Sequence, residues 1–158
     1  MSKPRIRVRN SPIHGRGVFA TVDLEAGIAL IRYQGRLLTH DEADERSDGR
    51  LDSGHTFLFT LNDEYVVDGN QGGNSARWIN HSCAPNCEAI IHENQHGDRC
   101  RDQVWIHTLR DIAAGEELSF NYGIVLSVPH TRRMKAIWAC HCGAANCTGT
   151  MLQPRKRS

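Results

Sequence analysis

The residues of this chain with the clearest chemical potential are cysteines near its C-terminal end. Cys140, Cys142 and Cys147 are closely spaced, and the sequence holds six cysteines in all. Thiolates grouped in this way bind zinc, which takes four ligands in a tetrahedron at structural sites. The alternative is three reduced cysteines in a loose tail. Spacing alone does not choose the fourth ligand among the remaining candidates, Cys83, Cys87, Cys100 and, more weakly, His141.

A second chemically unusual stretch runs from Arg77 to Asn86. It crowds Arg, Asn, His, Ser and Cys around one apolar pair, Trp78 and Ile79, and it follows the glycine-rich segment 69–73. Buried polar groups need hydrogen-bond partners, so such a stretch lies at the surface or lines a site. We expect one helical turn that leads into a binding pocket. A surface turn that carries a core or zinc-bound cysteine is the alternative.

A third stretch, Gly15-Arg16-Gly17-Val18-Phe19-Ala20, contains the glycine spacing of a dinucleotide-binding loop. That loop requires a helix that begins at the glycines. Val18 and Phe19 lead instead to Val22, which favours a strand followed by a turn. We therefore expect the glycines to let the backbone approach a ligand closely, without a Rossmann domain.

Together with one more segment, these stretches resemble the motifs of SET-domain protein-lysine methyltransferases, in the same order along the chain. The motifs are Gly15–Ala20, Arg77–Asn86, Gly115–Tyr122 and the post-SET zinc segment Cys140–Met151. They cover roughly residues 5 to 152, and the compact chain is similar to bacterial members. The resemblance implies methyl transfer from S-adenosylmethionine to a lysine amine of a protein substrate, possibly a histone or histone-like protein.

The resemblance also implies roles for single residues. Tyr122 orients the amine, Phe120 occupies the position that sets how many methyl groups fit, and Tyr33 walls the lysine channel. Phe at position 120 favours di- or trimethylation. In the family the fourth zinc ligand matches Cys83, which lies in the central stretch Arg77–Asn86. One metal would then join this stretch to the C-terminal segment that carries Cys140, Cys142 and Cys147. Contacts with the cofactor are expected from His14, Arg16, Gly17, Val18, Asn80, His81, His141 and Leu152.

The implied chemistry requires a neutral lysine. The reference pKa of lysine is ~10.4, so deprotonation at pH 7 costs roughly 4 to 5 kcal/mol. A neighbouring sulfonium and an apolar channel both lower that pKa, so no strong general base is needed. The chain departs from the family pattern at a few positions that bear on cofactor affinity and product state, namely Leu51, Phe57, Trp78 and Asn121.

Composition sets the broad class. The 158 residues, with 39% hydrophobic and 23% charged side chains, suit one compact soluble domain. The net charge of +1 gives no general attraction to nucleic acid, and no apolar run approaches the ~20 residues of a membrane span. No secretory signal follows Met1, so we expect a cytoplasmic protein with few disulfides, or one that acts in a host nucleus. The oligomeric state is not predicted.

The patterns along the chain predict a mostly β fold with short helices. Strands are expected at 5–9, from Val18, and at 28–33, 57–61, 65–67, 88–92, 104–109 and 118–122. Helices are expected from the capping box Thr39-x-x-Glu42 to about Arg46 and at 130–138. The resemblance implies a β-clip-like arrangement of small sheets with a pseudoknot, in which Asn80-His81 and the Tyr122 strand cross. The expected divisions are a SET domain at 5–123, a linker and post-SET segment at 124–152 and a basic tail at 153–158.

Two other functions fit part of the pattern. One is a non-catalytic, zinc-stapled protein-interaction module, which the presence of Tyr122, Asn80 and His81 disfavours. The other is a thiol enzyme that pairs Cys83 with His81. Zinc ligation by Cys83 excludes the thiol enzyme.

Overall fold

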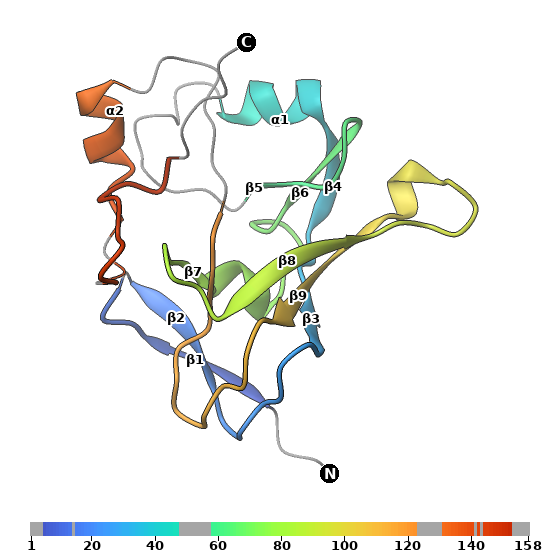
Figure 1. Ribbon diagram of the computed structural model, residues 1–158. Helices are drawn as coiled ribbons and strands as arrows, with labels where there is room; N and C mark the ends of the chain where they lie inside the picture. The colour runs from blue at the N-terminus through green and yellow to red at the C-terminus, as the bar shows by residue number, and fades with distance from the viewer. Residues whose placement is uncertain are drawn as a thin grey trace.

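Small β-sheets dominate the protein, as the sequence predicted (Figure 1). The computed structural model describes residues 5–13, 15–47, 58–122, 131–140, 142 and 144–152, with the backbone alone for 44–47. Two helices of more than one turn lie in this part, α1 (His40–Ser47) and α2 (Arg132–Ile137). No helix of the described part is long and apolar enough to cross a membrane.

The strands form three antiparallel sheets and one parallel pair. In hydrogen-bonded order, the antiparallel sheets are β1 (Ile6–Asn10) with β2 (Arg16–Ala20), β3 (Ala29–Arg32) with β9 (Gln103–Thr108) and β8 (Cys87–His92), and β4 (Arg36–Thr39) with β6 (Tyr65–Asp68) and β5 (Leu58–Thr60). Strand β2 takes the place of the helix that a dinucleotide-binding loop requires. The Rossmann alternative is therefore excluded, as expected.

The parallel pair is the crossing that the resemblance implied. Strand β7 (Asn80–His81) lies beside β10 (Ser119–Phe120), with Asn80 opposite Ser119 and His81 opposite Phe120. The strand expected at 118–122 is reduced to these two residues. Leu118 N–H bonds to Val18 O at 2.7 Å, and Tyr122 N–H bonds to His81 Nδ1 at 3.0 Å. One end of the segment is thus held by β2, and the other end by the side chain of His81 in β7.

The helix α1 begins at the predicted capping box. Thr39 N–H donates to Glu42 Oε1 at 3.1 Å, and Glu42 N–H donates to Thr39 Oγ1 at 3.2 Å. The sequence did not predict strand β4, because its four residues run directly into this helix. Burial of Leu38 against Ala43 and Val66 holds β4 and α1 together.

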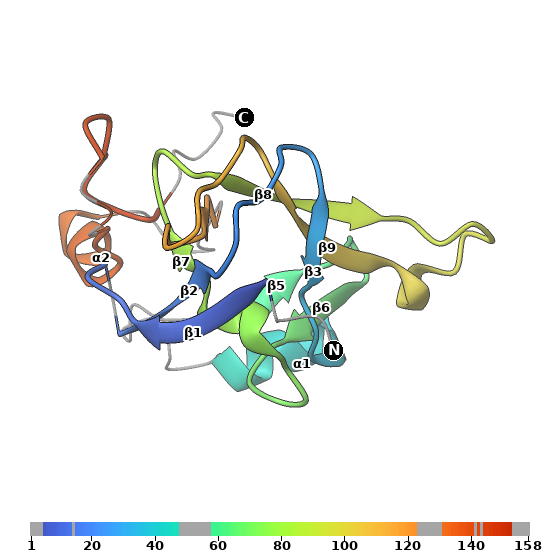
Figure 2. The same cartoon turned by 90° about the horizontal axis from the view of Figure 1, so that it is seen from below.

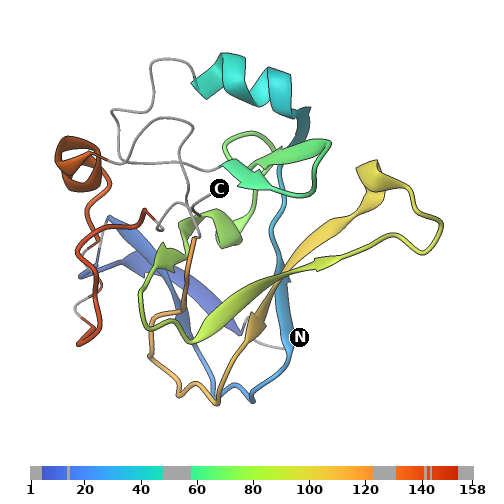
Figure 3. The same cartoon turned by 45° about the horizontal axis from the view of Figure 1, so that its top comes forward.

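Besides the small cluster of Leu38, Ala43 and Val66, the described residues form two further hydrophobic cores of unequal size. The larger one lies between the sheets, and its fully buried members include Val18, Ile106 and Leu118. The smaller one joins Trp138 and Leu152 in the C-terminal segment. In all three views this segment and the β8–β9 arm lie at opposite ends of the molecule (Figure 1, Figure 2, Figure 3). The crossing of β7 and β10 lies between them.

Candidate active site and metal centre

The site begins with the turn between β1 and β2, which the Asn80 side chain fastens. Ser11 N–H donates to Gly15 O at 2.8 Å and closes the turn. From β7, Asn80 Nδ2 lies 3.1 Å from Ser11 Oγ and 3.0 Å from Arg16 O. Asn80 is buried. Its amide therefore positions the glycine-containing backbone and keeps it against the crossing.

Glu117 is a member of this site that the sequence reasoning missed. Ser11 Oγ donates to its carboxylate, at 2.7 Å from Oε1 and 2.8 Å from Oε2. Asn80 Nδ2 lies 2.8 Å from Oε2. A Cβ atom on Gly17 would collide with the same carboxylate, so a side chain at position 17 would displace Glu117 from these partners. Glu117 thus joins the turn to β7. The sequence does not predict this role, because nothing in it distinguishes Glu117 from the adjacent Glu116.

His81 connects the crossing to the cysteines. Burial lowers the pKa of His81 to about 4, so its imidazole is neutral at pH 7. Nδ1 accepts the Tyr122 N–H at 3.0 Å, which places the ring hydrogen on Nε2. Nε2 in turn lies 3.8 Å from Cys83 Sγ. One imidazole therefore bridges the backbone of Tyr122 and a candidate metal ligand, in the way outer partners orient ligands at metal sites.

Tyr122 is held from both sides. Its hydroxyl donates to Ile79 O, and its ring meets the His81 ring edge-on at 5.3 Å between centroids. Burial, aided by nearby Tyr33 and Glu117, raises the pKa of Tyr122 above its ordinary value. The phenol stays protonated at neutral pH, so it can orient a ligand by hydrogen bonding but is a poor base.

Aromatic rings line the inner side of Tyr122. Centroids are 4.9 Å apart for Tyr122 and Phe120, 6.0 Å for Phe120 and Phe59, and 5.3 Å for Phe59 and Tyr33. This series of ring contacts brings the predicted residues Tyr33, Phe120 and Tyr122 together. Phe59, from strand β5, was not predicted. Burial raises the pKa of Tyr33, so this wall is uncharged.

Cationic side chains lie at the outer side of the turn. The Arg16 guanidinium is exposed and lies 5.5 Å from the ring centroid of Trp78, while that of Arg77 lies 4.7 Å from the same ring. The indole therefore holds Arg16 beside the turn, where its charge can pair with a carboxylate from solution.

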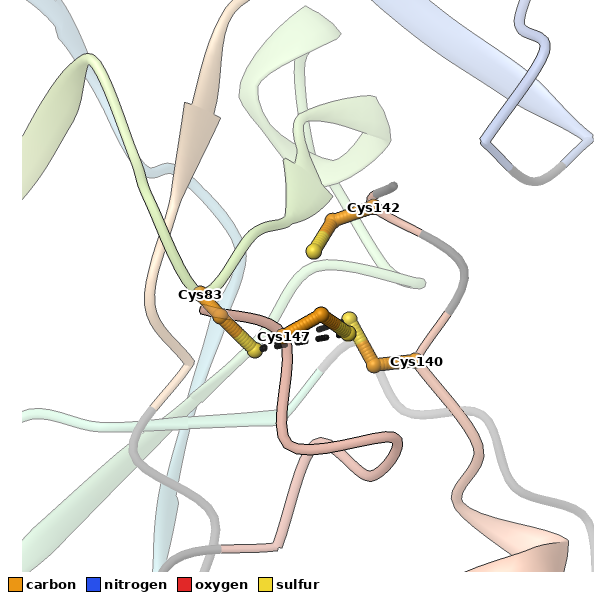
Figure 4. Close-up of side chains that lie close together, drawn as sticks. All are labelled: Cys83, Cys140, Cys142 and Cys147. Carbon is orange, nitrogen blue, oxygen red and sulfur yellow. Dashed lines mark hydrogen bonds between the residues drawn. The ribbon is translucent and has the colours of Figure 1, made fainter. Parts of the chain in front are cut away.

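Four cysteine sulfurs converge into a candidate metal centre. Figure 4 shows Cys83 from the central stretch facing three cysteines of the C-terminal segment. All four sulfurs lie within 4.8 Å of one another, and Cys83 Sγ lies 3.8 Å from Cys140 Sγ and 3.9 Å from Cys147 Sγ. A zinc tetrahedron with bonds of ~2.3 Å has an edge of about 3.8 Å. The set Cys83, Cys140, Cys142 and Cys147 therefore fits zinc.

The other two cysteines lie away from this centre. Cys87 is fully buried in the main core, where burial raises the pKa of its thiol to about 11. Cys100 is exposed in the loop of the β8–β9 arm. The structure places Cys83 beside the other three cysteines of the cluster. If Cys83 binds a metal there, it is not available as the nucleophile of a thiol enzyme.

The remaining predicted contacts are placed only in part. Val18 is buried in the main core, and Leu152 packs against Trp138 in the small one. His14 and His141 lie outside the described residues, as do Leu51 and Phe57. Their roles stay predictions.

Comparison with known proteins agrees with this geometry. A family model of the SET domain matches residues 15–123. Similar curated proteins include the histone-lysine N-methyltransferase Su(var)3-9 of Drosophila pseudoobscura pseudoobscura, which is 36% identical over 91% of this chain and 24% of its own length. Another is the histone-lysine N-methyltransferase ATXR7 of Arabidopsis thaliana, 36% identical over 91% of this chain and 10% of its own length. The chain thus spans a quarter or less of these relatives.

Proposed function

Because the chain belongs to the SET-domain family, we propose that it transfers a methyl group from S-adenosylmethionine to a lysine amine of a protein substrate. The observation that carries this proposal is the Tyr122 hydroxyl, fixed by Ile79 O at the end of a wall of aromatic rings. Both relatives above are named histone-lysine N-methyltransferases, which supports a histone or histone-like substrate.

Tyr122 acts by position in this proposal. Its hydroxyl hydrogen is committed to Ile79 O, so the oxygen lone pairs remain to accept a hydrogen bond from the incoming amine. The contact with His81 holds the ring and backbone of the tyrosine. Because methyl transfer is an in-line displacement, fixing the direction of the amine is the main contribution that the protein makes.

The aromatic wall favours the neutral amine. Phe120, Phe59 and the buried Tyr33 offer little solvation to an ammonium ion, which lowers the pKa of a lysine enclosed by them. Ring faces also attract methylated ammonium groups. Phe120 carries no hydroxyl that could hold a water beside the amine, so we propose that the enzyme adds more than one methyl group.

S-adenosylmethionine supplies an electrophilic methyl group on a sulfonium. The exposed Arg16 offers a cation for its carboxylate, and Gly17 and Val18 follow it in β2. The side chains of Asn80 and His81 are engaged within the protein, so we propose that they support the site and that their backbone faces the cofactor. Zinc on the four cysteines joins the C-terminal segment, with Leu152, to this region.

Calorimetry on the zinc-loaded chain tests the proposal. We expect saturable binding of S-adenosylmethionine, followed by lysine labelling when a lysate is treated with the protein and a transferable cofactor analogue. Mass spectrometry of the labelled proteins identifies the substrate. Absence of cofactor binding would favour the non-catalytic interaction module, and labelling confined to arginine or small molecules would refute the lysine assignment.

A further inference from the structure

The β8–β9 arm carries a pair of histidines that methyl transfer does not use. His92 is the last residue of β8, and His107 is the last but one of β9. Their Nε2 atoms are 2.9 Å apart, and the ring planes meet at 67°. Neutral imidazole nitrogens are the commonest metal ligands that proteins use, and here two of them converge.

The pair lies on the outward face of the sheet. Along β9, Val104, Ile106 and Thr108 are buried, whereas Trp105 and His107 alternate with them and are half-exposed. His92 is half-exposed as well. Water and small ions therefore reach the nitrogens, while the opposite face of the same strands belongs to the main core.

Neighbouring side chains hold the rings in place. The His92 ring stacks on Trp105, with 5.7 Å between centroids and 17° between planes. The indole is itself fixed, since Trp105 Nε1 donates to Gln103 Oε1 at 2.9 Å. A site whose ligands are ordered in advance loses less side-chain entropy when it binds.

The distance suits a metal ion. Imidazole nitrogens bind transition metals at ~2.0–2.1 Å, and two such ligands at 90° to each other are about 2.8–3.0 Å apart. The observed 2.9 Å separation of the His92 and His107 Nε2 atoms lies in that range. A right angle between ligands is the arrangement of square-planar or octahedral Ni²⁺ and Cu²⁺.

We propose that His92 and His107 form a second metal site, which takes a divalent transition ion that prefers imidazole, with water in the remaining positions. Two charged residues reach this face of the ladder: Glu88, opposite His107, and Arg32, opposite Trp105. The carboxylate of Glu88 favours a bound cation, and the guanidinium of Arg32 opposes it. Binding joins β8 to β9 and stabilises the arm.

The imidazole nitrogens of this site are harder ligands than the thiolates of the cysteine cluster, so the two sites prefer different metal ions. Thiolates select zinc, whereas imidazole also suits nickel and copper. The test therefore begins with zinc-loaded protein, so that the thiolates are occupied, and uses Ni²⁺ alone as the probe. Calorimetry measures the binding, tryptophan fluorescence reports quenching of Trp105, and a zinc-sensitive dye checks that the cysteine centre keeps its metal.

We expect a Ni²⁺-binding event of one equivalent that quenches fluorescence. His92→Gln and His107→Gln each weaken it by about tenfold or more, whereas His96→Gln, in the exposed loop of the same arm, leaves it unchanged. Trp105→Phe keeps the calorimetric signal and loses the quenching. Ni²⁺ also raises the melting temperature of the wild type and not of the two histidine variants.

Two results would overturn the proposal. One is equal Ni²⁺ affinity in the wild type and in His92→Gln or His107→Gln. The other is quenching that persists in Trp105→Phe, since the ion would then bind near a different tryptophan. The Trp105→Phe comparison retains both imidazoles, so it remains decisive even if a histidine variant does not fold. None of these measurements depends on methyl transfer.

Discussion

Two regions of the molecule hold reactive side chains by different means. One is the crossing of β7 with β10, and the other is the C-terminal segment. At the crossing, Asn80, Ser11 and Glu117 hydrogen-bond to one another across long stretches of sequence, against the main core. The C-terminal segment has its own small core of Trp138 and Leu152 and meets the central stretch at Cys83, through the sulfur cluster and through Asn146 Nδ2, 3.2 Å from Cys83 O. The crossing depends on packing and hydrogen bonds, whereas we propose that the segment depends on a metal held by the four cysteines.

The largest effect should come from removing the ligand that the two regions share. Cys83→Ser leaves three thiolates, and losing a quarter of the roughly 10–16 kcal/mol of zinc binding weakens affinity by about 10²- to 10³-fold. Chelator competition and metal analysis measure this, with Cys100→Ser as the matched control that keeps its zinc. Loss of zinc from Cys100→Ser alone would mean that the fourth ligand is wrong.

The next effect separates positioning from binding at the crossing. Tyr122→Phe removes the hydroxyl that orients the amine, so turnover should fall by about 10²-fold or more while cofactor affinity stays nearly intact. Single-turnover kinetics and calorimetry measure the two quantities. Tyr65→Phe, at a half-buried tyrosine of strand β6, is the control for loss of a tyrosine hydroxyl. Equal turnover in the two variants would remove Tyr122 from the reaction.

Two adjacent glutamates offer an internal comparison of stability. Glu117→Ala leaves Asn80 and Ser11 without their shared acceptor, so the free energy of unfolding should fall by about 1–3 kcal/mol. Glu116 pairs with Arg110 at the surface, at 3.0 Å, and Glu116→Ala should cost under about 1 kcal/mol. Urea denaturation measures both. A loss in Glu117→Ala no larger than that in Glu116→Ala would show that the crossing does not depend on Glu117.

The smallest effect concerns the product and not the rate. Phe120→Tyr adds a hydroxyl that can hold a water where a methylated amine must turn. The first methylation should persist while the later ones diminish. Mass spectrometry at matched turnover gives the mono-, di- and trimethyl ratios. Unchanged ratios would mean that Phe120 does not face the amine, although its ring lies 4.9 Å from that of Tyr122.

Local patterns were enough to predict much of the fold. The Thr39–Glu42 capping box and the alternation along β9 depend on neighbours in sequence, and both are present in the structure. Spacing grouped Cys140, Cys142 and Cys147, but only the likeness to a family chose Cys83 as the fourth ligand over Cys87, Cys100 and His141. In the structure the sulfur of Cys83 lies within 4.8 Å of the other three, whereas Cys87 is buried in the core and Cys100 is exposed on the β8–β9 hairpin.

Partners distant in sequence account for what was missed. Glu117 is distinguished from Glu116 only by the amide and hydroxyl that reach it from residues 80 and 11. Phe59 joins the aromatic wall because β5 lies beside the crossing, which no periodicity within 58–60 could show. Strand β4 is recognised only through its pairing with β6.

The parallel pairing of β7 with β10 also has a consequence for how the protein folds. Asn80 and Ser119 become neighbours only after the intervening chain, including the whole β8–β9 arm, has formed a closed loop. Closing such a loop costs chain entropy before any contact compensates for it, and topologies rich in distant contacts fold slowly. The arm, whose strands are joined by a local hairpin, can form early. Tyr122 and His81 meet only when the crossing closes, so partly folded chains lack the assembled site.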